Sequence, residues 1–187
     1  MGEDAEAVLR RLGNGARRCR ACPLWKGRIR AVPGEGPSRP LFVLVGEAPG
    51  RREDERGLPF CGASGRLLDG LLAEAGLERE ALFVTSAVKC RPPKNRNPRK
   101  DELCTCTERW LFPQLEALAP APVVLLGRVA MEAVLGIREA LTSVRGKVRR
   151  REGRAFLVTY HPAAALRDPR RKAPLVRDLK KAEFLNS

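Results

Sequence analysis

Four short apolar runs constrain the fold of this 187-residue chain more than any other feature of its sequence. Their length and their content of β-branched residues predict buried strands at 41–46, 82–88, 123–127 and 155–160. Segments with helical periodicity lie between them, and this alternation is typical of a parallel sheet with helices on its faces. We therefore predict an α/β fold, with a single domain (1–187) built around a mostly parallel four-stranded sheet.

The expected helices follow from the spacing of apolar residues and from the glycines that end them. They cover 3–12, 64–75, 101–119, 128–136 and a last segment that begins near Pro174. Gly13 is expected to end the first of these helices, and Ser64 and Gly76 to cap the second at its two ends.

Polar residues follow the predicted strands: Glu47 after the first, 86–89 at the end of the second, and His161 after the fourth. If the strands are parallel, these residues share one edge of the sheet, where open α/β sheets bind their ligands. The loop after Glu47 adds the carboxylates of Glu53 and Asp54 and the ring of Phe60. This group suits a flat polar ligand, although an ordinary charged strand-to-helix loop would have similar residues.

The balance of charge indicates a polyanionic partner. The chain has 36 Lys and Arg against 22 Asp and Glu, a formal net charge of +14, which points first to nucleic acid. A thermophilic surface rich in ion pairs, or attraction to acidic membranes, would explain such a one-sided excess less well. Two regions supply candidate phosphate contacts. The proline-rich loop 89–100 has a stiff backbone, and the segment 141–154 is basic and turn-rich.

The candidate DNA-binding cations in these two regions are Lys89, Arg91, Lys94, Arg96 and Arg145. No apolar run of membrane-spanning length is present, and the first residues are acidic, unlike a signal peptide. We therefore expect a cytoplasmic protein that does not bind membranes.

The six cysteines are expected to be reduced, because a chain without a secretion signal favours metal binding over a disulfide framework. Cys19 and Cys22 form a C-x-x-C pair, and Cys90 with either Cys104 or Cys106 can complete a set of four. Four thiolates suit both a zinc ion and an iron–sulfur cluster, so the sequence pattern leaves these two open.

Five motifs in order identify a resemblance. They are GEAPG (46–50), the pair Glu53–Asp54, GLPF (57–60), VKCRPPKNR (88–96) and YHP (160–162). Together they resemble the uracil-DNA glycosylase superfamily, and most of all its prokaryotic iron–sulfur group, family 4. The resemblance runs from Cys19 to the final helix and implies an α/β/α sandwich with an N-terminal cluster-binding segment at about 1–30.

The resemblance also implies a [4Fe-4S] cluster, generally structural, on Cys19, Cys22, Cys90 and Cys106, with Cys104 as the spare cysteine. The implied activity is hydrolysis of the N-glycosidic bond of uracil in DNA. This reaction leaves an abasic site and is the first step of base excision repair. The enzyme would flip the base out of the stack into a pocket. We expect a monomer that acts on single- or double-stranded DNA without lyase activity, since no lysine stands in a nucleophile motif.

The roles implied by the resemblance fall on individual residues. Phe60 corresponds to the ring that stacks on the base, and His161 to the donor that stabilises negative charge on the departing uracil. Glu47 and Ala48 correspond to the loop that lines the pocket, while Glu53 and Asn95 would place the water or the substrate. Leu166 and Arg167 resemble the wedge that enters the minor groove, although Leu166 could equally be a packing residue.

One position departs from the family pattern. Ser86 stands where the family has an asparagine whose amide reads uracil N3–H and O4 together, and a hydroxyl cannot make both of those hydrogen bonds without a water. This departure predicts a lower rate on uracil or weaker discrimination against other deaminated bases such as hypoxanthine and xanthine. It also gives weight to a second reading, an iron–sulfur DNA-binding module with little turnover. A third reading, a redox iron–sulfur protein, would explain the cysteines but neither the net charge of +14 nor the GEAPG and YHP motifs.

Overall fold

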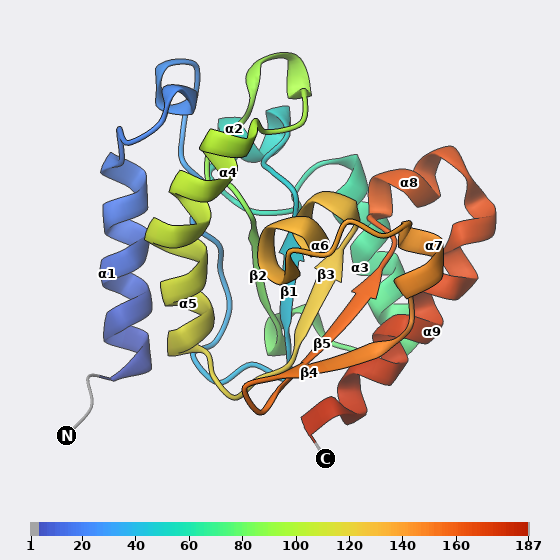
Figure 1. The fold of residues 1–187 in the computed structure, drawn as a ribbon. Coiled ribbons are helices and arrows are strands. Elements are labelled where there is room, and N and C mark those ends of the chain that lie inside the picture. The colour runs from blue at the N-terminus through green and yellow to red at the C-terminus, as the bar shows by residue number, and fades with distance from the viewer. Residues whose placement is uncertain (1–3, 187) are drawn as a thin grey trace.

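The computed structural model of the chain describes residues 4–186, and a five-stranded sheet forms its centre (Figure 1). The strands are β1 (Val43–Gly46), β2 (Phe83–Ser86), β3 (Val123–Leu126), β4 (Val148–Arg151) and β5 (Arg154–Thr159), in the order β2-β1-β3-β5-β4. All pairs are parallel except β4 with β5, which is antiparallel. The predicted fold class, a mostly parallel sheet flanked by helices, is therefore confirmed, and all four predicted strands are present.

The fifth strand, β4, was missed because its sequence, VRRR, has no apolar alternation. It lies at the edge of the sheet, where charged side chains are common and hinder pairing with another chain. Its single apolar residue, Val148, packs against the core from a half-buried position.

The α-helices are α1 (Ala5–Arg18), α2 (Arg51–Arg56), α3 (Ala63–Ala75), α4 (Lys100–Cys106), α5 (Phe112–Ala117), α6 (Arg128–Leu135), α7 (Leu141–Val144), α8 (Pro162–Arg167) and α9 (Lys172–Glu183). A π-helical turn (Thr107–Leu111) joins α4 to α5, so the predicted helix over 101–119 is one continuous helical segment. The helices α2, α7 and α8 were not predicted, because each has at most six residues and is too short to show periodicity. No helix between residues 4 and 186 is long and apolar enough to cross a membrane.

The sheet separates two apolar layers, because alternate side chains of each strand point to opposite faces. Leu44, Val124 and Leu157 face α3 and α9, while Val43 and Leu125 face α5 and α6. Figure 1 shows these helices on the two sides of the sheet. The predicted α/β/α layering follows directly from this alternation of fully buried side chains.

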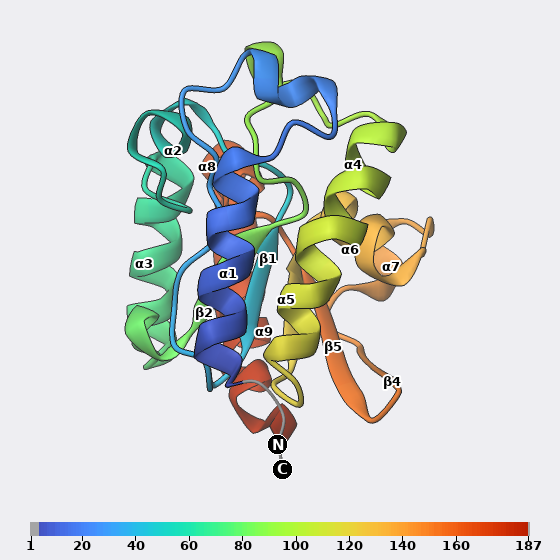
Figure 2. The same ribbon diagram turned by 90° about the vertical axis from the view of Figure 1, so that its left-hand side faces the viewer.

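The first helix continues past Gly13, so the prediction that it ends there is wrong. Gly13 and Gly15 lie inside α1, which packs beside α5 (Figure 2). A Cβ atom at Gly15 would lie 2.7 Å from the ring of Trp110. The glycine therefore allows a close approach between two helices, and α1 ends instead at Arg18, with Cys19 as its C-terminal cap.

Candidate functional site: a base-sized cavity and a cysteine cavity

A cavity of about 480 Å³ opens at the carboxyl ends of the parallel strands. It is the edge of the sheet that the sequence predicted for a ligand. The cavity is lined by residues of all five motifs, among them Glu47, Ala48, Glu53, Phe60, Ser86, Asn95, Arg96, His161 and Arg167. Every residue predicted to act in catalysis or to bind the base thus lies in this one cavity.

His161 begins α8 and caps it. Its Nδ1 atom accepts a hydrogen bond from the backbone N–H of Ala163 at 3.1 Å. Burial, with a smaller contribution from Arg167, lowers the pKa of His161 to about 4. The ring is therefore neutral at physiological pH, and because Nδ1 is an acceptor, the proton sits on Nε2. The helix cap thereby fixes the tautomer that can donate to a ligand.

Phe60 lies next to His161, with ring centroids 5.7 Å apart and an interplanar angle of 29°. The ring packs over Gly46, where a Cβ atom would lie 2.6 Å from the Phe60 Cζ atom and 3.3 Å from the Ser86 Oγ atom. Ser86 is itself buried at the end of β2. Gly46 thus leaves room for the ring, and the hydroxyl of Ser86 shares that space.

Glu47 follows β1 and is half-buried at the cavity wall. Burial raises the pKa of its carboxyl group, and the positive charge of Arg128 opposes this shift. Arg128 starts α6 directly after the third strand. A carboxylate with a raised pKa in a cleft is a candidate to accept a proton.

Glu53 and Asp54 both hold loops. The two oxygens of Glu53 accept hydrogen bonds from the backbone N–H groups of Gly50 at 3.1 Å and Gly62 at 2.7 Å. Asp54 is buried and accepts from the backbone N–H of Ile29 at 2.9 Å. Since both oxygens of Glu53 are bonded, its geometry favours holding the loop that carries Phe60, and a role toward water stays a prediction.

The structure corrects one of the predicted DNA contacts outright. Lys89 is only 1% exposed, so DNA phosphate cannot reach it. Its Nζ atom donates to the hydroxyl of Thr85 at 2.7 Å and to the carbonyl of Ser86 at 2.8 Å. Burial lowers the pKa of Lys89 to about 7. The sequence could not show this, because a lysine in a basic loop is normally exposed.

Two further cations have protein partners. The guanidinium of Arg96 binds the buried carboxylate of Glu102 through two bonds of 2.7 and 2.8 Å. Arg145 pairs with Asp178 at 2.7 Å. Both arginines are thus engaged in holding the fold, which weakens their assignment as phosphate contacts.

The remaining candidates are accessible. Lys94, Leu166 and Arg167 are exposed, and Arg91 is half-buried with its Nε atom bonded to the Asn95 Oδ1 atom at 2.7 Å. Asn95 and Arg96 of the 91–96 loop and Arg167 at the end of α8 line the cavity, so both segments border its mouth. They are the part of the predicted interface that a DNA backbone can reach.

The four predicted metal ligands line a second, much smaller cavity. Cys19 and Cys22 come from the segment after α1, Cys90 from the extension of β2, and Cys106 from the end of α4. The spare cysteine, Cys104, is exposed and does not line the cavity. Within residues 4–186, no group of three or more His, Cys, Asp or Glu side chains is arranged to hold a single metal ion.

Three sulfurs in this cavity accept hydrogen bonds: Cys19 from the backbone of Ala21, Cys90 from the Arg28 guanidinium at 3.1 Å, and Cys106 from the backbone N–H of Lys89 at 3.2 Å. Burial raises the pKa of the Cys22 and Cys90 thiols, and raises that of Cys106 to about 12.

Sequence reasoning missed two arginines: Arg128, whose charge opposes the rise that burial causes in the pKa of Glu47, and Arg28, which donates a hydrogen bond to Cys90. Arg128 could have been found, because it directly follows Gly127 at a predicted strand end. Arg28 carried no signal, because it lies 62 residues from Cys90 in the sequence.

Comparison with known proteins gives consistent matches. Residues 33–183 match the family model of the uracil DNA glycosylase superfamily. The chain is 42% identical over 176 residues to the type-4 uracil-DNA glycosylase of Sulfurisphaera tokodaii, covering 89% of this chain and 80% of the relative. It is 41% identical over 181 residues to that of Saccharolobus solfataricus, covering 92% and 83%. A type-5 uracil-DNA glycosylase of Thermus thermophilus is 37% identical over 180 residues, covering 76% and 81%.

Proposed function

Because this chain belongs to the uracil-DNA glycosylase superfamily, we propose that it hydrolyses the N-glycosidic bond of uracil in DNA and leaves an abasic site. The observation that carries the proposal is the neutral His161, fixed with its proton on Nε2 beside Phe60 in a cavity at the strand ends. A flipped base fits such a cavity with its face on the phenylalanine and its edge toward the histidine.

We propose the following steps for the reaction at this site. When the bond between the sugar and the base breaks, both electrons move to the base, and negative charge develops on its carbonyl oxygen. The Nε2–H of His161 donates to that oxygen, and a fixed donor aimed at developing charge is a large catalytic contribution. A water oxygen then bonds to the sugar carbon, and Glu47, whose pKa is raised, accepts the proton that the water loses.

We propose that Cys19, Cys22, Cys90 and Cys106 hold a [4Fe-4S] cluster, because four cysteine thiols are the donor set that such a cluster requires. The four sulfurs come from three separate segments, and N–H groups donate to three of them, as is common around cluster sulfurs. The cluster would supply a cross-link between the N-terminal segment, at about 1–30, and the segment that follows β2. Zinc would use the same four thiols, so metal analysis distinguishes the two.

The DNA-binding face consists of the exposed cations at the mouth of the cavity together with the wedge formed by Leu166 and Arg167. Phosphate contacts from Lys94 would position the duplex, and Leu166 would fill the gap left by the flipped base. A monomeric state and a cytoplasmic location stay predictions.

Ser86 is the position at which base preference should differ from the family pattern. Its hydroxyl lies near Gly46 and Phe60, where the edge of a bound base would be read. A serine hydroxyl makes fewer hydrogen bonds to uracil than an asparagine amide does. The Ser86→Asn variant should therefore release uracil about tenfold faster, the value of one added hydrogen bond.

A single-turnover assay on matched oligonucleotides tests the proposal. The strands would carry uracil, hypoxanthine, xanthine or cytosine, and alkali would cleave any abasic site. We expect release of uracil, and weaker release of hypoxanthine or xanthine if Ser86 relaxes discrimination. Binding without release of any base would contradict the proposal and favour the DNA-binding module.

A further inference from the structure

The loop that carries Phe60 holds an unfavourable backbone conformation. Phe60 has a φ of +49°, and it is one of four non-glycine residues with a positive φ in the described part of the chain. A bulky side chain in this region keeps such a conformation only when the surrounding structure imposes it. Something must therefore hold the loop from Pro59 to Gly62.

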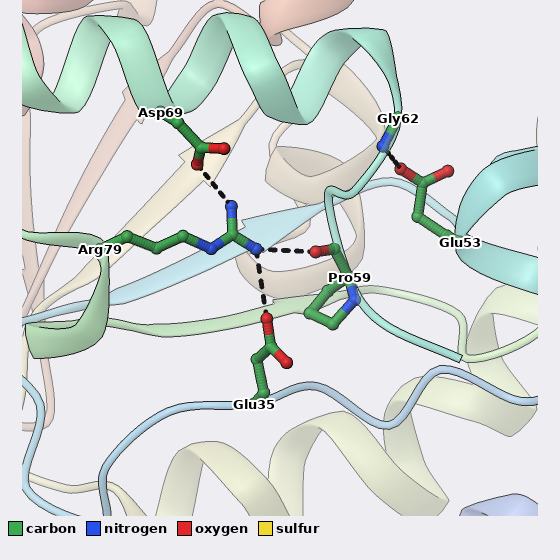
Figure 3. Close-up of polar contacts among 6 residues, drawn as sticks. All are labelled: Glu35, Glu53, Pro59, Gly62, Asp69 and Arg79. Atoms are coloured by element: carbon green, nitrogen blue, oxygen red, sulfur yellow. Dashed lines mark hydrogen bonds and ion pairs between the residues drawn. The ribbon is translucent and has the colours of Figure 1, made fainter. Parts of the chain in front are cut away.

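Two side chains fix the two ends of this loop (Figure 3). The Nη2 atom of Arg79 donates to the carbonyl oxygen of Pro59 at 2.7 Å, directly before Phe60. Glu53 accepts from the N–H of Gly62 at 2.7 Å on the other side. Between them the backbone of Gly65, in the first turn of α3, lies close to the Phe60 carbonyl. A Cβ atom at Gly65 would lie 1.6 Å from that oxygen.

Arg79 is itself anchored from two directions. Its Nη1 atom donates to Asp69 on α3 at 2.8 Å, and its Nη2 atom pairs with Glu35 at 3.3 Å (Figure 3). The arginine side chain is only 21% exposed, although it belongs to a short 3-10 turn (Arg79–Ala81) that precedes β2. Three acceptors from separate segments thus use one guanidinium, whose planar fork suits this arrangement.

Arg79 is poorly placed to bind DNA. Its charge is offset by the two carboxylates of Glu35 and Asp69, which leave this group with a net negative charge that would repel phosphate. The two ion pairs do not account for its third contact, the hydrogen bond to the uncharged backbone carbonyl of Pro59. That carbonyl belongs to the residue before the ring that faces His161.

We propose that Arg79 is a positioning residue for base binding: it holds the Pro59 carbonyl and thereby keeps the Phe60 ring over Gly46 and against His161. This role rests on the proposed function, since it assumes that a base stacks on Phe60. Arg79 does not touch the base, and it acts only through the loop.

The test compares Arg79→Met with the wild-type protein in two assays. Inhibition of the single-turnover reaction by free uracil reports on the base pocket alone, and binding of a duplex with an abasic-site analogue reports on the DNA interface. We expect Arg79→Met to weaken inhibition by uracil about tenfold, because a displaced ring loses part of its stacking on the base. Binding of the abasic duplex should change less than about twofold, because a distant phosphate interface dominates it.

Asp69→Asn and Glu35→Gln are the matched controls. Each removes one ion pair of Arg79 but leaves its bond to the Pro59 carbonyl, so inhibition by uracil should stay at the wild-type value. If Arg79→Met folds too poorly to assay, Arg79→Lys is the second variant, because it keeps the positive charge but lacks the planar guanidinium. It should weaken inhibition by uracil about threefold and leave binding of the abasic duplex unchanged.

Three results would overturn the inference. Equal loss of uracil inhibition and of abasic-duplex binding would mean a general structural role, as would loss of uracil inhibition in the two control variants. Wild-type inhibition in both Arg79 variants would mean that the bond to Pro59 does not position the ring. Failure of the proposed function looks different, because the wild-type protein itself would then release no base from any oligonucleotide.

Discussion

The base cavity and the cysteine cavity share one stretch of chain, yet they differ in size and in how their polar groups are paired. Ser86 lines the base cavity, while Lys89 and Cys90, a few residues further along, line the cysteine cavity. The base cavity has about 480 Å³ and is lined largely by polar groups. The cysteine cavity has about 10 Å³, close to the lower limit for a single water molecule.

This difference indicates a division of tasks. In the cysteine cavity, the protein itself supplies partners: Arg28 donates to Cys90, and the backbone of Lys89 donates to Cys106. In the base cavity, the Nε2–H of His161 and the carboxylate of Glu47 face space that a ligand can fill. We therefore expect changes at the base cavity to alter rate, and changes at the cysteine cavity to alter stability.

The largest effect is expected at His161. His161→Ala removes the donor to the departing base, and single-turnover release of uracil should fall about 10²–10³-fold. Affinity for DNA should change little, as a binding measurement on uncleaved substrate would show. His161→Ser is the control for the helix cap, because a serine oxygen can still accept from the Ala163 N–H. Near-normal turnover in either variant would contradict the assigned role.

The cysteine cavity should respond in stability. Cys106→Ser removes a buried thiol that we propose as a cluster ligand, and we expect the melting temperature to fall by roughly 10 °C, which corresponds to about 3 kcal/mol in a chain of this size. Iron content and the visible absorbance of a cluster should be lost as well. Cys104→Ser is the matched control, because that exposed thiol lies outside the cavity and its loss should have no effect. Equal losses in the two variants would refute the ligand set.

The pH dependence distinguishes the titrating groups of the base cavity. Because the pKa of His161 is lowered from 6.5 to about 4, the folded protein should show no change in rate near pH 6.5. As the pH drops, His161 of the unfolded chain is protonated at a higher pH than His161 of the folded chain. The free energy of unfolding should therefore fall between pH 6.5 and pH 4. The rate should fall at acidic pH as Glu47, whose pKa is raised, becomes protonated. This fall should be absent in Glu47→Gln. A rate inflection near pH 6.5 would show that His161 is not held neutral.

The smallest effect is expected at the mouth of the base cavity. Lys94 is exposed, and Lys94→Ala should weaken DNA binding uniformly across sequences and reduce the salt slope by about 1. The measurement is the DNA dissociation constant over a series of salt concentrations. An unchanged slope would remove Lys94 from the interface.

Local patterns in the sequence predicted much of this structure. Each apolar run is itself the signal for a strand, and parallel strands bring Glu47, Ser86 and His161 to one edge of the sheet. The roles of these residues came from the resemblance, because composition alone does not distinguish a catalytic histidine from a structural one.

The rest depends on contacts between residues that are distant in sequence. The burial of Lys89 and the bond from Arg79 to Pro59 arise only after folding, and neither leaves a periodic pattern. The strand β4 was missed for a related reason, since its place at the sheet edge, and not its own sequence, makes it a strand.

The single-turnover rate of uracil release by Cys106→Ser, expressed per folded molecule, tests the division between the two cavities most directly. A separate active-site titration with substrate in excess counts the folded fraction, and the single-turnover rate constant reports on the base cavity alone. A rate within about threefold of the wild-type value is predicted, because the cysteine cavity supports the fold but contributes no group to the reaction. A loss as large as that of His161→Ala would contradict this account and would place the cysteine cavity within the catalytic machinery.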